Sequence, residues 1–197
     1  MAKLINAINL ISRMYYIRVM LISSLLTACT YNSSLPREWG NITNKGNECP
    51  TISGRYSNIG EESPDNPPRD TYDKIQLSEL LLPGIESELI EINHVEINQE
   101  NGNNIVLSAW DNSSLIYKKS IERRVQFECT GKYIIISESS MESPEGGIYY
   151  SNAKIYLAKN TEGFLVVNEY IKNRGLALLV IPYASNKSYW YRFSEYK

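Results

Sequence analysis

Few side chains in this sequence have the chemistry of a nucleophile or a general base. The chain has three cysteines, Cys29, Cys49 and Cys129, and a single histidine, His94. A cysteine thiolate is alkylated, binds a metal or forms a disulfide, and an imidazole exchanges protons near neutral pH. No Gly-x-Ser-x-Gly pattern accompanies His94, and neither Cys49 nor Cys129 has a second Cys or His at metal-ligand spacing. We therefore expect no catalytic residue, no metal and no cofactor, and we expect His94 to be a surface or β-bulge residue.

Cys29 stands directly after an apolar run over residues 19–28. Residues 1–28 contain three basic residues and no acidic one. A helix of the length of this run rises only about 15 Å, half of the roughly 30 Å hydrocarbon core of a bilayer. The run is therefore too short to span a membrane, and its basic flank and length are typical of a signal peptide.

The end of this run, Leu26-Thr27-Ala28-Cys29, resembles the lipobox of bacterial lipoprotein signal peptides. That pattern has an apolar residue, a small residue, Ala, Gly or Ser, and an invariant Cys, and all four positions match. The resemblance implies cleavage between Ala28 and Cys29, a diacylglycerol on the Cys29 thiol, and acylation of the new amino group, for example with palmitate. It also implies a place in the bacterial envelope, and Thr30 favours the periplasmic face of the outer membrane. The alternative is an ordinary signal peptide that happens to precede a cysteine.

With Cys29 acylated, Cys49 and Cys129 remain as an even pair in an oxidising compartment. A disulfide between them would close a loop of about 80 residues and stabilise the fold by roughly 4–5 kcal/mol in the chain-entropy model. The alternative is that both cysteines remain free thiols.

Charge excludes one class of partner. Loss of residues 1–28 removes three basic residues, so the remaining chain is more acidic than the formal charge of −2 of the whole sequence. An acidic chain does not attract nucleic acid or anionic lipid by its net charge. We therefore expect no nucleic-acid partner, and we expect the acyl chains to supply the membrane binding.

The pattern after residue 48 predicts a single β domain over 49–197, preceded by a flexible tether over 29–48. Apolar residues recur with period two in about ten segments that are separated by turn residues. One short amphipathic helix is expected over 75–82, because Pro83-Gly84 would end it. We expect an antiparallel meander that closes into a small lipocalin-like barrel, with a two-sheet β-sandwich as the alternative.

The C-terminal region is predicted to form three short strands, over 164–171, 176–181 and 189–193. Asn173-Arg174-Gly175 and the polar residues of 182–187 predict the two turns between them.

Segments after Cys29 resemble a loose group of small, uncharacterised Gram-negative lipoproteins. They are Cys49-Pro50-x-Ile52-x-Gly54-x-Tyr56 and the stretches 163–167 and 190–193. The Gly-x-aromatic strand also resembles the opening of lipocalin-like barrels. The group has no assigned activity, so the resemblance implies a location and not a reaction.

Aromatic residues gather in the C-terminal half of the sequence. Tyr and Trp combine an apolar body with a polar tip and are common in binding patches. We expect a binding face that includes Tyr149, Tyr156, Tyr189, Trp190 and Tyr191. The alternative is core and cross-strand packing, since adjacent residues of a strand point to opposite faces.

Together these patterns predict an envelope lipoprotein that is a binding or accessory module and not an enzyme. The expected partners are the membrane, through the lipid anchor, and an envelope protein, a peptidoglycan fragment or a small apolar ligand. One alternative is a structural subunit of an envelope secretion or conjugation complex. A second alternative is an envelope hydrolase that uses carboxylates on its loops.

Overall fold

The structure is a computed structural model that describes residues 29–31, 34–43, 46, 48–68, 74–85, 91–100, 102–142, 147–177 and 181–197. The predicted signal peptide, residues 1–28, lies outside the described residues. Of the two residues at the predicted cleavage site, Ala28 and Cys29, only Cys29 is described. The described chain is mostly β, arranged in two sheets, with one short α-helix and one 3-10 helix. The expected fold class and the short helix are confirmed.

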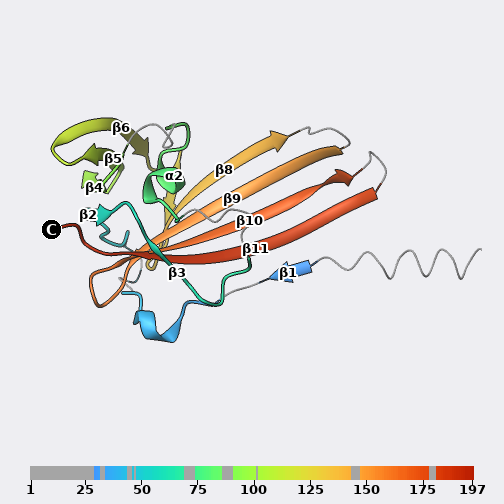
Figure 1. Cartoon of the computed structure of the whole chain (residues 1–197), viewed down its shortest axis with the longest axis horizontal. Coiled ribbons are helices and arrows are strands. Elements are labelled where there is room, and N and C mark those ends of the chain that lie inside the picture. The colour runs from blue at the N-terminus through green and yellow to red at the C-terminus, as the bar shows by residue number, and fades with distance from the viewer. Residues whose placement is uncertain are drawn as a thin grey trace, which may run out of the picture.

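The strands become longer toward the C-terminus (Figure 1). The elements in chain order are β1 (Cys29–Tyr31), η1 (Arg37–Trp39), β2 (Gly54–Ser57), β3 (Glu61–Glu62), α2 (Leu77–Leu81), β4 (His94–Glu100), β5 (Asn104–Asp111), β6 (Ser114–Glu122), β7 (Phe127–Cys129), β8 (Ile134–Glu142), β9 (Gly147–Lys159), β10 (Leu165–Ala177) and β11 (Ile181–Phe193). β9, β10 and β11 have 13 residues each.

The smaller sheet is antiparallel and has the order β2-β4-β5-β6. Its central strands alternate apolar and polar residues, so one face turns inward. Val95, Ile97 and Leu107 lie on that inner face and are almost fully buried. The β4–β5 turn passes through Gly102, whose φ of 69° is a conformation that glycine adopts without steric cost.

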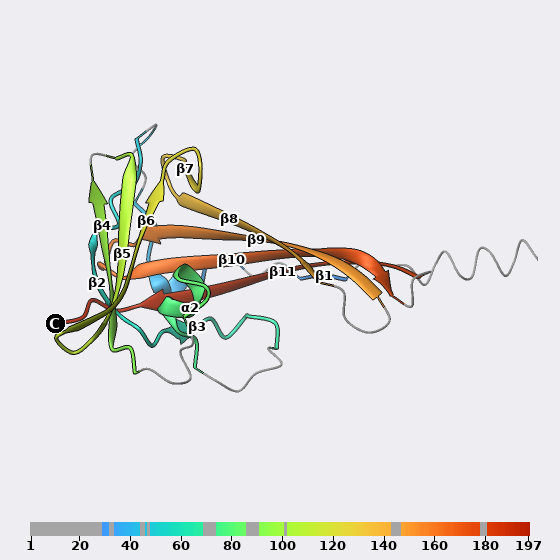
Figure 2. The same cartoon turned by 90° about the horizontal axis from the view of Figure 1, so that it is seen from above.

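The larger sheet has the order β1-β11-β10-β9-β8-β7, and β3 also pairs with β11. β10 pairs antiparallel with both β9 and β11 over its whole length. One end of β8, β9, β10 and β11 lies beside the smaller sheet, and we call this part of the protein the body. The other end of these strands extends well beyond the smaller sheet (Figures 1 and 2). We call this extension, residues 137–142, 147–154, 170–177 and 181–188, the arm.

The main hydrophobic core lies in the body and combines side chains of both sheets. Tyr56, Tyr191 and Phe193 are its largest fully buried side chains. The hydroxyl of Tyr56 donates to the carbonyl oxygen of Ile52 at 2.8 Å, which satisfies the polar end of this buried ring. α2 contributes the buried Leu77 to the same core.

Cys49 and Cys129 form a disulfide, with their Cα atoms 5.1 Å apart. The predicted pairing is confirmed. Cys49 precedes β2 of the smaller sheet and Cys129 ends β7 of the larger one. The bond therefore links the two sheets across 80 residues of sequence.

The barrel expected from the sequence is wrong, and the two-sheet alternative describes the fold. Besides sharing the main core, the two sheets are joined by isolated bridges. One joins Tyr56 of β2 to Glu195, which follows β11, and the other joins Arg123, which follows β6, to Phe127 of β7. A closed barrel needs strands that are paired on both sides over comparable lengths. β7 has three residues and β9 has 13, so the long strands run past the smaller sheet and do not close with it.

The two C-terminal turns predicted from polar residues are also wrong. Asn173, Arg174 and Gly175 lie inside β10, and 182–187 lie inside β11. These residues pair with each other across the two strands, which supplies the backbone hydrogen bonds that a turn would break. Because the arm extends beyond the smaller sheet, its strands can carry polar residues on both faces, so composition alone misplaces their ends.

The predicted flexible tether over 29–48 is partly folded onto the body. η1 places Trp39 in a buried cluster with Val166 and Trp190, and Trp39 is only 3% exposed. Ile42 forms a bridge with Asn160. Residues 34–43 therefore belong to the packed domain, held by the burial of Trp39 and by backbone hydrogen bonds from Thr43 N–H to the Lys159 carbonyl oxygen and from Thr161 N–H to the Asn41 carbonyl oxygen.

Candidate functional site

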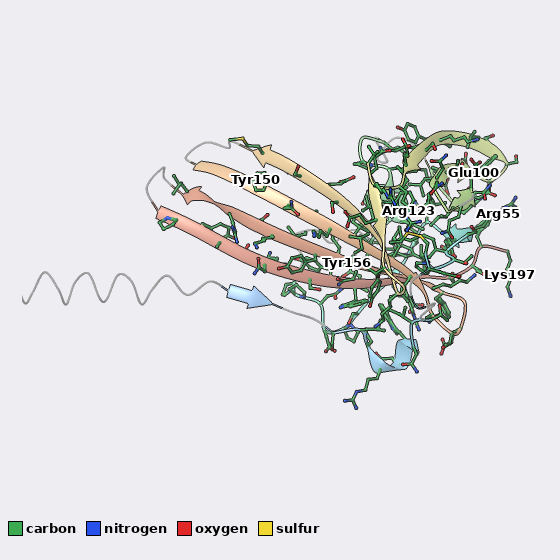
Figure 3. The ribbon with its side chains drawn as sticks, turned by 180° about the vertical axis from the view of Figure 1, so that it is seen from behind. Arg55, Glu100, Arg123, Tyr150, Tyr156 and Lys197 are labelled. Carbon is green, nitrogen blue, oxygen red and sulfur yellow. A yellow bond between two sulfur atoms is a disulfide. The ribbon has the colours of Figure 1, made fainter. Side chains whose placement is uncertain are left out.

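A hollow of about 420 Å³ lies on one face of the larger sheet. It is lined by alternate residues of two neighbouring strands, Tyr150, Asn152, Lys154 and Tyr156 of β9 and Tyr170, Lys172 and Arg174 of β10. Alternate residues of a strand point to the same side, and the β9–β10 register aligns the two sets. Tyr150 lies toward the far end of the arm and Tyr156 nearer the body (Figure 3).

The pairing register mixes aromatic and cationic side chains along the hollow. Arg174 lies opposite Tyr150, and Tyr170 lies opposite Lys154. Lys172 lies opposite Asn152, between these two rows. Tyr150 and Tyr170 therefore each have a positive charge directly across the strand pair, whereas Tyr156 lies opposite Asn168. This spacing suits a ligand with both ring faces and anionic groups.

On the described parts of the two strands that flank β9 and β10, no acidic residue shares the face of the hollow. The described residues of β8 and β11 that share this face by register are Ile135, Ser137, Ser139, Met141, Pro182, Ala184, Asn186, Ser188, Trp190 and Arg192. Within the described chain no ion pair joins Lys154, Lys172 or Arg174 to a carboxylate. Their positive charge is therefore available to an anionic ligand.

At the end of the hollow nearest the body, the residue opposite Tyr156 on β10 is Asn168. Asn168 is buried there, and its Nδ2 donates to Ser188 Oγ at 2.8 Å and to the Tyr189 carbonyl oxygen at 3.0 Å. The ring of Tyr156 meets the ring of Tyr133 edge to face, with centroids 5.7 Å apart. The contact with Tyr133 restrains Tyr156 before any ligand arrives, which lowers the entropy cost of binding.

The sheet divides the five residues that the sequence assigned to a binding face. Tyr156 lines the hollow. Trp190 is on the same face by register, but it is buried in the cluster with Trp39. For Tyr149 the structure describes the backbone, which pairs with Glu142 and Gly175.

Tyr189 and Tyr191 point to the opposite face and belong to the main core. Their rings stack with centroids 6.4 Å apart, and the Tyr191 hydroxyl donates to Glu169 Oε2 at 3.1 Å. The set of five therefore does not form one face, because strand alternation separates Tyr189 and Tyr191 from Trp190.

The polar and cationic residues of the hollow were missed from the sequence, namely Asn152, Lys154, Lys172 and Arg174. Tyr150 and Tyr170 belong to the aromatic residues of the C-terminal half but were not among the five assigned to a binding face. A signal was present in the period-two series Tyr-x-Asn-x-Lys-x-Tyr over 150–156 and Tyr-x-Lys-x-Arg over 170–174. The second series was hidden because its last residue was placed in a predicted turn.

The prediction of His94 as a surface or bulge residue is wrong. His94 is 4% exposed, and the β4–β5 register is regular from His94 onward. Its ring stacks on Tyr196 with centroids 4.4 Å apart and lies parallel to Trp110 at 6.1 Å. Burial lowers the pKa of the imidazole, the charge of Arg55 lowers it further, and Glu96 opposes both effects. The packing of His94 between rings is that of a neutral structural side chain.

No family model matches this chain, and no curated protein or solved structure matches it. In the described part of the chain, no group of three or more His, Cys, Asp or Glu side chains is placed to hold a metal ion. The described helices include none that is long and apolar enough to cross a bilayer. The groups that the structure does gather, in the hollow of the arm, are suited to binding.

Proposed function

We propose that this protein is a lipid-anchored envelope protein that binds an anionic ligand in the hollow of the arm. The proposal rests on one observation: on one face of the sheet, Tyr150 lies opposite Arg174 and Tyr170 lies opposite Lys154. A peptidoglycan fragment is the ligand class that we favour, because its sugar rings pack on tyrosine and its carboxylates pair with Lys and Arg. A small apolar ligand fits less well, since the lining is charged.

The proposed anchor is a lipid on Cys29, and the support for it is the match of residues 26–29 to the lipobox. Two or more acyl chains are enough for stable attachment, whereas a single chain is marginal. Growth with labelled palmitate tests the anchor. The full-length protein should carry the label and float with membranes, and Cys29→Ala should lose both properties. Unchanged flotation of Cys29→Ala would contradict the anchor.

Ligand binding is tested by titrating the full-length protein, in detergent micelles, with soluble peptidoglycan fragments. A charge-assisted hydrogen bond contributes about 1.5–3 kcal/mol, so Lys172→Gln with Arg174→Gln should weaken binding by at least about tenfold. Lys118→Gln with Lys119→Gln removes the same charge from β6 of the other sheet and is the matched control. Equal affinities of the two double variants would contradict the proposed site.

A further inference from the structure

The far end of the arm carries exposed apolar side chains. The large apolar or aromatic side chains that are exposed there are Met141, Tyr150, Leu176 and Tyr183. Met141 is 73% exposed and Leu176 is 41% exposed. Single exposed apolar residues are ordinary, but a group of them at one end of an elongated protein marks a surface that contacts something.

The position of β1 brings the proposed lipid to the same end. β1 runs parallel to β11, and Cys29 lies opposite Ser185. Ser185 pairs with Asn173, which stands three residues before Leu176 on β10. At about 3.3 Å per residue, the row formed by Leu176 and Pro182 lies roughly 10 Å beyond Cys29 along the arm.

Given the lipid anchor proposed above, we infer that the far end of the arm docks on the bilayer that holds the lipid. A diacylglycerol on Cys29 places that residue at headgroup level. The row of Leu176 and Pro182 then reaches into the boundary between headgroups and acyl chains, because interfacial segments bury their apolar face by about 5–10 Å. The lipid and the strand ends therefore contact the same surface.

The row of residues next to Leu176 has side chains that suit contact with a bilayer better than contact with a second copy of this chain. Arg174 and Tyr150 form the row just behind Leu176. Tyrosine and arginine concentrate at membrane interfaces, where the ring or stem packs on apolar groups and the polar tip reaches the headgroups. In the sequence, 176–182 contains no charged residue. The row of Leu176 and Pro182 is apolar and can pack on acyl chains, and Arg174 behind it can pair with lipid phosphate.

Docking at this end also orients the protein. The body lies at one end of the long strands, and the far end of the arm lies at the other (Figure 2). The hollow begins at the row of Tyr150 and Arg174 and continues toward the body to Tyr156, so its end nearest the body would face the space directly above the headgroups. A single lipid anchor on a flexible segment would not impose this orientation, whereas a second contact beside Cys29 does.

The test uses the full-length, lipid-modified protein with one fluorophore at a new thiol. With Cys29 alkylated and Cys49 bonded to Cys129, Leu176→Cys introduces a single free thiol. Val125→Cys is the matched control, since Val125 is 74% exposed and lies between β6 and β7, away from the arm. Each labelled protein is reconstituted into vesicles of phosphatidylethanolamine and phosphatidylglycerol that contain a nitroxide-labelled lipid as quencher.

We expect several-fold quenching of the fluorophore at position 176 and almost none at position 125. Equal, weak quenching at both positions in protein that floats with the vesicles would overturn the docking and leave the lipid anchor intact. Protection of position 176 from a soluble quencher without quenching by lipid would assign this end to a protein contact and overturn the docking. Failure of the protein to float would overturn the anchor and the docking together.

Discussion

Asn160 joins the N-terminal segment to the larger sheet by donating from Nδ2 to the carbonyl oxygen of Trp39, at 2.6 Å. Its Oδ1 accepts from the backbone N–H groups of Glu162, at 3.1 Å, and Phe164, at 2.8 Å. One buried amide therefore shapes the turn between β9 and β10 and holds Trp39 in its cluster. Side chains that satisfy several backbone groups at once are expensive to remove.

Replacement of this side chain should destabilise the fold. Asn160→Ala leaves the carbonyl of Trp39 and two backbone N–H groups without their partner, so the free energy of unfolding should fall by about 2 kcal/mol. Urea denaturation of both proteins measures the change. Asn98→Ala, at an exposed position of β4, is the control and should stay within about 0.5 kcal/mol of the parent. Equal effects of the two substitutions would contradict the role of Asn160.

Removal of the disulfide, by reduction or by substitution of both cysteines, should lower the stability of the fold. The bond spans 80 residues, so its loss should lower the free energy of unfolding by about 4–5 kcal/mol in the chain-entropy model. Chemical reduction of the parent and the double substitution Cys49→Ala with Cys129→Ala should give similar losses in urea denaturation. Reductant should not affect the double variant. A parent that is unaffected by reduction would contradict the assigned contribution of the bond.

His94 should make stability fall below neutral pH. The imidazole has a pKa of 6.5 when unperturbed, and burial lowers that pKa in the folded protein. As pH falls through 6.5, the unfolded chain takes up a proton that the folded protein does not accept, so the free energy of unfolding decreases. The slope cannot exceed about 1.4 kcal/mol per pH unit for one group.

The measurement for His94 is urea denaturation across this pH range, with His94→Gln as the comparison. His94 is the single histidine, and a hydrogen bond from Lys159 lowers the pKa of the Glu195 carboxyl, so that carboxyl stays ionised at this pH. The decrease in stability should therefore be smaller in His94→Gln. The same pH dependence in both proteins would contradict the assignment to His94.

The rings of the hollow should contribute to ligand binding independently of its charges. Tyr170→Ala removes one ring from the lining. Stacking contacts of this kind contribute about 0.5–1.5 kcal/mol beyond buried area, so affinity should fall about two- to tenfold. Tyr117→Ala, at an exposed position of β6, is the control. Titration with the same peptidoglycan fragments checks the effect, and equal affinity of both variants would argue against stacking on Tyr170.

The sequence by itself determined the features that depend on local chemistry. Period-two alternation is set by the geometry of a single strand, and it identified the strands of the smaller sheet, such as β5. Pro83 and Gly84 marked the end of the only expected helix, which is α2. The pairing of Cys49 with Cys129 followed from their number and from the oxidising compartment that the lipobox implies.

Only the tertiary structure decided which strands continue, which residues share a face and whether the sheets close. Gly175 and Pro182 interrupt a pattern in the sequence, yet β10 and β11 pass through both because their partner strands supply the backbone hydrogen bonds. Trp39 became part of the core because the larger sheet offered it a cluster formed by residues more than a hundred positions away. The hollow depends on the register between β9 and β10, and register is a relation between two strands that neither strand specifies alone.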